Sequence, residues 1–270
     1  MTPNPRPIAF ILASTDHGAM ILNKNDFNVK EGGHAYGVAA QLLFSSSYDP
    51  GDMALTTLLL DLRRQHFGDD VTALDIGANI GVFTIGWAKH MHTWGAVLAI
   101  EAQERIFLAL AGNIALNNCF NARPICAAVT RQPGTMAVPV PNYLIPGSYG
   151  SLELRRRENT EDIGQPIDYS EAKMMTIAAV SVDGLQLGRV DLMKIDVEGM
   201  EMEVLEGARR TIGQNHPILV VEAHKIERAA LKRYLDEFGY RDFSVGINVV
   251  AIHPSDPSIH TMRERLLGLR

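Results

Sequence analysis

The residues best suited to bind a ligand surround a glycine-spaced turn at residues 75–81, Asp-Ile-Gly-Ala-Asn-Ile-Gly. Mostly apolar residues precede Asp75, and residues 82–88 have the apolar spacing of a helix. A buried strand, a tight turn and a helix in this order form the opening unit of a nucleotide-binding α/β sheet. Gly77 allows the turn to close and Gly81 allows the helix to pack on the strand, while unpaired N–H groups at the helix N-terminus face the ligand.

The spacing of this turn, Gly-x-Asn-x-Gly, differs from the Gly-x-Gly-x-x-Gly pattern of dinucleotide-binding turns. Asp75 would repel a phosphate, but it suits a ligand that carries an ammonium group. S-adenosylmethionine has such an amine at its methionine end, and its sulfonium is also positive. The alternative is an ordinary strand–turn–helix unit of an unrelated α/β enzyme.

Further acidic residues are predicted at or just after the carboxyl ends of other strands, where open α/β sheets bind their ligands. Glu101 ends the strand predicted at 96–100, where its carboxylate could accept both hydroxyls of a ribose. Methyl transfer to oxygen requires a base within hydrogen-bond reach of the acceptor, or a metal that lowers the pKa of the acceptor. The candidates for that proton transfer are Asp196, Glu198, Glu222 and His224.

Several of these residues also have simpler interpretations. Glu198 could complement the dipole at a helix start, and His224 could cap a strand or helix. Lys194 is interpreted as an ion-pair partner inside the sheet. Ala128, at the end of the third strand, could admit an adenine ring or simply pack in the core. Carboxylates at one sheet edge would also suit a divalent cation, which the spacing neither requires nor excludes.

Composition and charge limit the classes of function. A chain of 270 residues with 46% hydrophobic residues can form one sizeable core, with or without a small appendage. The net charge of −6 disfavours nucleic acid as a partner, since the one basic cluster, at 155–157, is followed by acidic residues. Cys119 and Cys126 have no metal-ligand spacing, and no apolar run could span a membrane, so we expect a cytoplasmic protein.

The chain divides into three predicted segments. Residues 1–65 form an N-terminal hairpin and helix extension, residues 66–257 a ligand-binding α/β domain, and residues 258–270 a terminal helix or tail. A polar, proline- and glycine-punctuated insertion at 131–173 is long enough to face the substrate, most of all at 147–151. Oligomeric state is left open, with a homodimer as one alternative.

The α/β domain is predicted to alternate strands with helices, which implies a mostly parallel sheet. Strands are expected at 71–75, 96–100, 123–130, 174–182, 190–196, 218–222, 240–245 and 247–252. Helices are expected at 53–65, 82–88, 104–118 and 225–238, with another that carries Val204 to Ile212. The last two strands form an antiparallel hairpin that ends a seven-stranded sheet.

Four stretches together resemble the FkbM family of S-adenosylmethionine-dependent methyltransferases. They are Asp75 to Gly81, Asn113 to Asn117, the Lys-Ile-Asp-Val-Glu-Gly-Met-Glu run at 194–201, and Glu222-Ala223-His224. The resemblance covers residues 70–250 and implies a Rossmann-like class I methyltransferase fold, with O-methylation that is often directed to sugars. It implies that Asp75, Gly77, Asn79 and Gly81 hold the methionine part of the cofactor, that Glu101 holds the ribose, and that Asp196 with Glu198 lines the transfer site. Asp196, Ala102 and Ala128 are further candidates for cofactor binding. Gln103 departs from the family pattern on the adenine side.

We therefore predict an S-adenosylmethionine-dependent O-methyltransferase that acts on a sugar hydroxyl of a polysaccharide, a glycolipid or a glycosylated metabolite. One alternative is the same chemistry on a peptide terminus or a small metabolite. A second is a non-catalytic module that binds S-adenosylmethionine, and a dinucleotide oxidoreductase is the remaining enzymatic rival. The predicted partners are thus a small-molecule or saccharide substrate, with no nucleic acid and no membrane span.

Overall fold

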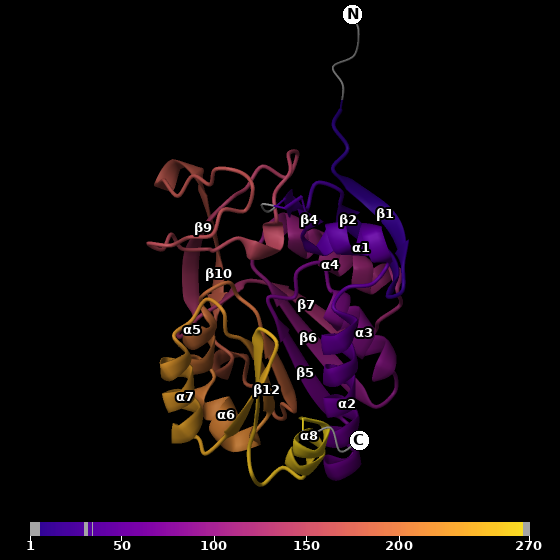
Figure 1. Cartoon of the computed structure of the whole chain (residues 1–270), viewed down its shortest axis with the longest axis vertical. Helices are drawn as coiled ribbons and strands as arrows, with labels where there is room; N and C mark the ends of the chain where they lie inside the picture. The colour runs from indigo at the N-terminus through magenta and orange to yellow at the C-terminus, as the bar shows by residue number, and fades with distance from the viewer. Residues whose placement is uncertain (1–5, 30–31, 34, 267–270) are drawn as a thin grey trace, which may run out of the picture.

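The strand before the glycine turn lies in the middle of a seven-stranded sheet (Figure 1). The structure, a computed structural model, describes residues 6–29, 32–33 and 35–266. The sheet order is β13-β14-β12-β11-β5-β6-β7, in which β14 runs antiparallel to both of its neighbours. These strands are β5 (Val71–Ile76), β6 (Gly95–Glu101), β7 (Ala122–Cys126), β11 (Leu192–Ile195), β12 (Ile218–Glu222), β13 (Arg241–Val245) and β14 (Asn248–Ile252). The predicted mostly parallel sheet that ends in an antiparallel hairpin is confirmed.

Helices cover both faces of this sheet (Figure 1). One face packs against α2 (Pro50–Phe67), α3 (Val82–His90), α4 (Glu104–Leu116) and α8 (Ser258–Leu266). The other packs against α5 (Glu201–Glu206), α6 (Arg209–Asn215) and α7 (Arg228–Glu237). Residues 267–269 of the predicted terminal helix lie outside the described residues. None of the described helices is both long and apolar enough to cross a membrane.

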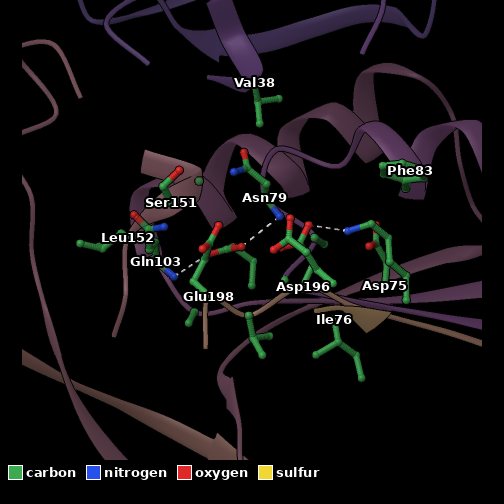
Figure 2. Close-up of a pocket in the computed structure, with 18 of the residues that line it drawn as sticks. Val38, Asp75, Ile76, Asn79, Phe83, Gln103, Ser151, Leu152, Asp196 and Glu198 are labelled. Carbon is green, nitrogen blue, oxygen red and sulfur yellow. Dashed lines mark hydrogen bonds and ion pairs between the residues drawn. The ribbon is translucent and has the colours of Figure 1, made fainter. Parts of the chain in front are cut away.

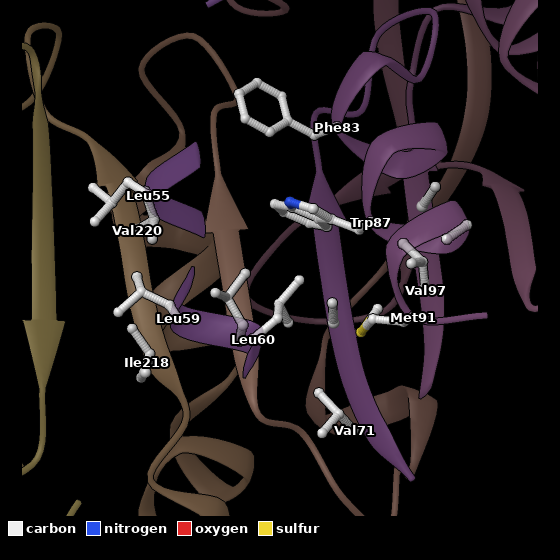
Figure 3. Close-up of a cluster of buried hydrophobic side chains, with 14 of the residues drawn as sticks. Leu55, Leu59, Leu60, Val71, Phe83, Trp87, Met91, Val97, Ile218 and Val220 are labelled. Carbon is white, nitrogen blue, oxygen red and sulfur yellow. The ribbon is translucent and has the colours of Figure 1, made fainter. Parts of the chain in front are cut away.

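Successive side chains of each strand point to opposite faces of the sheet, and so contribute to two hydrophobic cores. Ile218 and Val220 of β12 face the α2 and α3 side, whereas Leu219 and Val221 face the α5–α7 side. Figure 3 shows the first core, where leucines of α2 and Trp87 of α3 pack in one cluster against apolar residues of the strands. Burying apolar side chains on both faces fixes the strand register, and hence which residues reach the carboxyl ends.

The N-terminal segment lies over that end of the sheet (Figure 1). The predicted hairpin is present as β1 (Phe10–Thr15) and β2 (Gly18–Asn23), followed by β3 (Asn28–Val29), β4 (Ala35–Tyr36) and α1 (Val38–Ser45). The buried Asn113 side chain joins β2 to the glycine turn. Its Oδ1 accepts the Ile21 N–H at 2.6 Å, and its Nδ2 donates to the carbonyls of Ile21 at 3.1 Å and Ile80 at 2.8 Å.

The strand predicted at 123–130 is wrong as a single element. The chain leaves the main sheet at Ala127, whose N–H donates to the Glu101 carbonyl at 3.1 Å. β8 (Ala128–Val129) then joins a second sheet of order β8-β10-β9, with β9 (Gly134–Pro139) and β10 (Met174–Val180). The first part of the 131–173 insertion is therefore a regular strand, and the remainder includes the 3₁₀ turns η1 (Tyr149–Ser151) and η2 (Glu171–Lys173).

Several predicted helices have different bounds, and the one predicted at 225–238 begins only at Arg228, as α7. α2 begins at Pro50 rather than Met53, because proline is favoured in the first turn, where its missing N–H is not needed. The helix that carries Val204 to Ile212 is divided into α5 and α6 at Gly207. A Cβ at Gly207 would lie 2.2 Å from the Thr130 carbonyl oxygen, so the main chain of the second sheet packs directly against this break. A further 3₁₀ turn, η3 (Asp183–Leu185), lies between β10 and β11.

Candidate active site

The carboxyl ends of β5, β6, β11 and β12 border a cavity of about 330 Å³, here called the strand-end cavity (Figure 2). β5 and β11 are neighbours whose chain connections lead to opposite sides, which is the switch point where open α/β sheets bind ligands. All predicted site residues except Gly81 line it, namely Asp75, Gly77, Asn79, Glu101, Ala102, Ala128, Asp196, Glu198, Glu222 and His224. The topology therefore gathers these residues at one site.

Gly77 is the tightest point of the first turn. Its φ is +82°, and a Cβ there would lie 1.7 Å from the Asp196 carbonyl oxygen. Asn79 is also in the left-handed region, with φ +49°, and its N–H donates to Glu101 Oε2 at 2.9 Å. Gly81 has another use, because a Cβ there would lie 2.5 Å from Leu110 Cδ1 of α4. Gly81 thus permits helix packing and does not line the cavity.

Glu101 is held at the end of β6 by main-chain donors. Oε2 accepts the Asn79 N–H, and Oε1 accepts the Gln103 N–H at 2.7 Å. Burial raises the pKa of Glu101 to about 7, although these hydrogen bonds oppose the shift. Each carboxylate oxygen has a second lone pair, so the side chain can still accept hydrogen bonds from a ribose. Gln103, where the sequence departs from the family pattern, donates from Nε2 to the Tyr149 carbonyl at 2.8 Å and so links β6 to the insertion.

A partly buried lysine, Lys194, contacts one acidic side chain at the end of β11 and is paired in the sheet with another on β5, Asp75. Lys194 Nζ donates to Asp196 Oδ2 at 2.7 Å, and Asp75 accepts a hydrogen bond from Thr84 Oγ1 at 2.6 Å. Burial opposes the charge on Lys194, but the carboxylates of Asp196 and Asp75 outweigh it and raise the pKa of Lys194. Burial raises the pKa of Asp75, with Lys194 opposing. Lys194 is thus an ion-pair partner that keeps the Asp196 carboxylate ionised.

The other carboxylates of the cavity are in different protonation states. Burial would raise the pKa of Asp196, but Lys194 and a hydrogen bond from Glu222 outweigh it and lower that pKa. Burial, followed by the charges of Asp196 and Glu198, raises the pKa of Glu222 far above its ordinary value. Asp196 is therefore the ionised member of the pair, and Glu222 is the protonated member that donates to it. His224 Nδ1 lies 3.5 Å from Glu222 Oε2.

Glu198 has a pKa between these extremes. Burial, ahead of the Asp196 charge, raises the pKa of Glu198 to about 8, while Lys225 opposes the shift. The main chain at Glu198 has φ +55°, a conformation uncommon for a residue with a side chain, which suggests a functional constraint. Its Oε2 forms an ion pair with Lys225 Nζ. Glu198, like Glu101, thus has a pKa raised close to neutral pH.

Sequence reasoning missed Lys225 and Glu161. Lys225 Nζ lies 2.8 Å from Glu161 Oε2 and also contacts Glu198, so it joins the insertion to the loops after β11 and β12. Both residues lie in loops and belong to no periodic pattern. Only their contacts in the folded structure reveal their part in the site. The N-terminal extension and the insertion also contribute to the cavity lining, through Tyr36, Val38, Gln41, Tyr48, Ser148, Gly150, Ser151 and Leu152.

Two groups of side chains could share a cation by distance alone. Each places one oxygen or nitrogen per residue within 4.8 Å of the others, and they are Asp196, Glu198 and Glu222, and Glu161, Glu198 and His224. Lys194 and Lys225 already contact carboxylates of these groups. A chelator titration of turnover tests whether either group holds a metal.

Comparison with known proteins identifies the family. A family model described as the methyltransferase FkbM domain matches residues 75–241. The chain belongs to the FkbM methyltransferase family. The predicted family is thus confirmed.

Individual relatives of this FkbM methyltransferase are distant. Methyltransferase 1 of Beauveria bassiana (strain ARSEF 2860) is 29% identical over 154 residues, which cover 52% of this chain and 59% of the relative. Methyltransferase sdnD of Sordaria araneosa is 29% identical over 153 residues, with coverages of 50% and 59%. The chain therefore matches less than two thirds of either relative. The crystal structure of Methyltransferase FkbM from Methylobacillus flagellatus KT is 16% identical, with a TM-score of 0.47 over 71% of this chain and 48% of that chain.

The lining of the strand-end cavity fits S-adenosylmethionine, the cofactor that the sequence predicts. The acidic Asp75 and Asp196 suit the ammonium and sulfonium charges, and Glu101 suits the ribose hydroxyls. Ala102 and Ala128 are small enough to leave room for an adenine ring. We expect these residues, with Gly77 and Asn79, to hold S-adenosylmethionine.

The substitution Glu101→Gln tests this assignment. An amide can accept only one of the two N–H donors that Glu101 receives, and its own NH₂ would face the other. We expect the affinity for S-adenosylhomocysteine to fall about tenfold, or about 1.4 kcal/mol, measured by calorimetry. Glu104→Gln, on the exposed start of α4, is the matched control and should bind normally. Unchanged affinity in the Glu101 variant would remove that residue from the ribose site.

Proposed function

We propose that this FkbM methyltransferase transfers a methyl group from S-adenosylmethionine to a hydroxyl of a sugar. The observation that carries the proposal is the Glu198 carboxyl, which lines the strand-end cavity with its pKa raised to about 8. A general base works best when its pKa is near the working pH, and a hydroxyl must lose its proton during methylation. A carboxylate at its ordinary pKa would be a weaker base for this step.

The neighbouring residues have separate roles in this mechanism. When bound, S-adenosylmethionine supplies an electrophilic methyl group on a positively charged sulfur. Asp196, kept ionised by Lys194 and by the Glu222 hydrogen bond, stabilises positive charge in the cavity. Glu198 accepts the proton of the acceptor hydroxyl, and Lys225 holds the Glu198 carboxylate in place. Of the four candidates for proton transfer in the sequence analysis, this proposal assigns the role of base to Glu198.

One further feature supports a polar acceptor, and another supports a cytoplasmic location. On the exposed side of the strand-end cavity, Glu161 and His224 can hydrogen-bond a polar acceptor, beside the apolar Ile247. Both cysteines are free, which suits the proposed cytoplasmic location. Methylation of a peptide terminus or a small metabolite would use the same base, so the acceptor class needs a direct test.

Calorimetric titration with S-adenosylmethionine and S-adenosylhomocysteine is the first experiment. We expect both to bind at micromolar concentrations and reduced nicotinamide cofactors not to bind. Formation of S-adenosylhomocysteine is then measured with methyl glycosides, with short peptides and with hydroxylated apolar metabolites. Cofactor binding with turnover of peptides alone would replace the sugar proposal, and absence of cofactor binding would leave a module without its expected ligand.

A further inference from the structure

A second cavity lies beside the strand-end cavity and is not explained by cofactor binding. It measures about 400 Å³ and is bordered by residues 153–161 of the insertion and by His224 and Lys225, so we call it the insertion cavity. Glu161 and His224 line both cavities, which places the two side by side. One potential ligand atom of each of Glu161, Glu198 and His224 lies within 4.8 Å of the others. The insertion cavity is therefore next to the proposed base.

The lining of the insertion cavity indicates the chemistry of its ligand. Every lining residue is polar or charged, including Glu153, Arg157, Glu158 and Asn159. The positive charges of Arg157 and Lys225 offset much of the negative charge of the glutamates, so the lining favours neither a strongly charged anion nor an apolar molecule. A neutral ligand with many hydroxyl groups can use both the donors and the acceptors.

Ion pairs and hydrogen bonds fix the walls of the insertion cavity. Lys225 Nζ lies 2.8 Å from Glu161 Oε2 and 3.7 Å from Glu153 Oε1. Arg157 Nη2 donates to the Lys225 carbonyl at 2.8 Å. These contacts tie the insertion to the loop after β12, so the cavity is formed before any ligand arrives, which lowers the cost of binding.

A more apolar cavity elsewhere does not meet the same requirement. It is lined by Ile8, Phe10 and Leu144 together with Arg6 and Arg105, among others, and measures about 740 Å³. None of its lining residues also lines the strand-end cavity. An acceptor bound there would lie away from Glu198, so this cavity is not the acceptor site.

We infer that the insertion cavity is the acceptor subsite, and that residues 157–161 and 224–225 bind a neutral polyhydroxylated acceptor with one hydroxyl directed at Glu198. This inference rests on the proposed function, because it assumes that methyl transfer takes place in the strand-end cavity. It adds the location of the acceptor and the residues that select it.

Bulk introduced at Asn159 tests the inference. Asn159 lines the insertion cavity but not the strand-end cavity, and it is exposed, so Asn159→Trp should fold normally. With methyl hexosides and methyl deoxyhexosides as probes, we expect kcat/KM to fall about 100-fold, mainly through KM, because the acceptor is displaced. Asn159→Ala should have a smaller effect in the same direction. The affinity for S-adenosylhomocysteine should remain within about threefold in both variants.

Gln132→Trp is the matched control, since Gln132 is exposed in the same insertion but lines none of these cavities. Normal glycoside turnover by Asn159→Trp would overturn the subsite while leaving the proposed function intact. Turnover of apolar alcohols alone, or of neither class by a protein that binds S-adenosylhomocysteine, would also overturn it. Failure of the wild-type chain to bind S-adenosylhomocysteine would instead count against the proposed function.

Discussion

Replacement of Glu198 by glutamine is expected to lower kcat about 100-fold or more while leaving cofactor affinity nearly unchanged. A positioned general base contributes roughly 10²- to 10⁴-fold to the rate, and an amide cannot accept the proton. The substitution keeps the size of the side chain and its position at the cavity. It removes one charge next to Lys225, which retains Glu161 at 2.8 Å as an ion-pair partner.

The pH profile separates a chemical role of Glu198 from a structural one. Burial raises the pKa of Glu198 to about 8, so the basic form accumulates as the pH rises through that value. Wild-type kcat/KM for the acceptor should therefore rise with pH and reach a plateau above about pH 8, because kcat/KM reports the pKa values of the enzyme before the acceptor binds. The Glu198→Gln variant should lose this rise, whereas the exposed Glu171→Gln control should keep it. A profile with the same rise in the Glu198 variant would assign the base to another residue, with His224 the next candidate.

The sequence predicted the parts of the fold that depend on local periodicity. Buried runs such as 218–222 and the glycine turn at 75–81 have strong short-range signals, and the sheet follows from their alternation with helices. The split of 123–130 had no such signal. It depends on the pairing of Ala128 with Ala179 and Val129 with Val180, and a partner 51 residues away cannot be read from apolar content.

The candidate site, like the fold, was predicted only in part. Residues in motifs, such as Asp75 and Glu198, were predicted because strand ends meet at one edge of a sheet. The pKa shifts of Asp196 and Glu198 were not predictable, because they arise from burial together with the charges of Lys194 and Lys225. Lys225 carries no motif of its own. Its importance comes from three carboxylates brought to it from separate segments, Glu153, Glu161 and Glu198.

Gly77→Ala is expected to damage both the fold and the cofactor site. A Cβ at Gly77 would lie 1.7 Å from the Asp196 carbonyl oxygen, so the end of β11 must move away from the turn. The φ of +82° adds strain for any residue with a side chain. Together, strain and overpacking should lower the free energy of unfolding by about 3 kcal/mol or more. Because Asp196 shifts with the turn, affinity for S-adenosylhomocysteine should fall about 100-fold.

Gly68 provides a matched control for the conformational part of this effect. Its φ is +81°, almost the same as that of Gly77, but a Cβ there would have no neighbour within 4 Å among the described residues. Gly68→Ala should therefore lower the free energy of unfolding only by the strain of a side chain at φ +81° and ψ −177°, about 1 to 3 kcal/mol, and should bind S-adenosylhomocysteine normally. Chemical denaturation and calorimetry on both variants measure the difference. Equal stability losses in the two variants would show that backbone strain alone explains the need for glycine at position 77. Normal binding by Gly77→Ala would show that the close approach of the turn to β11 does not shape the cofactor site.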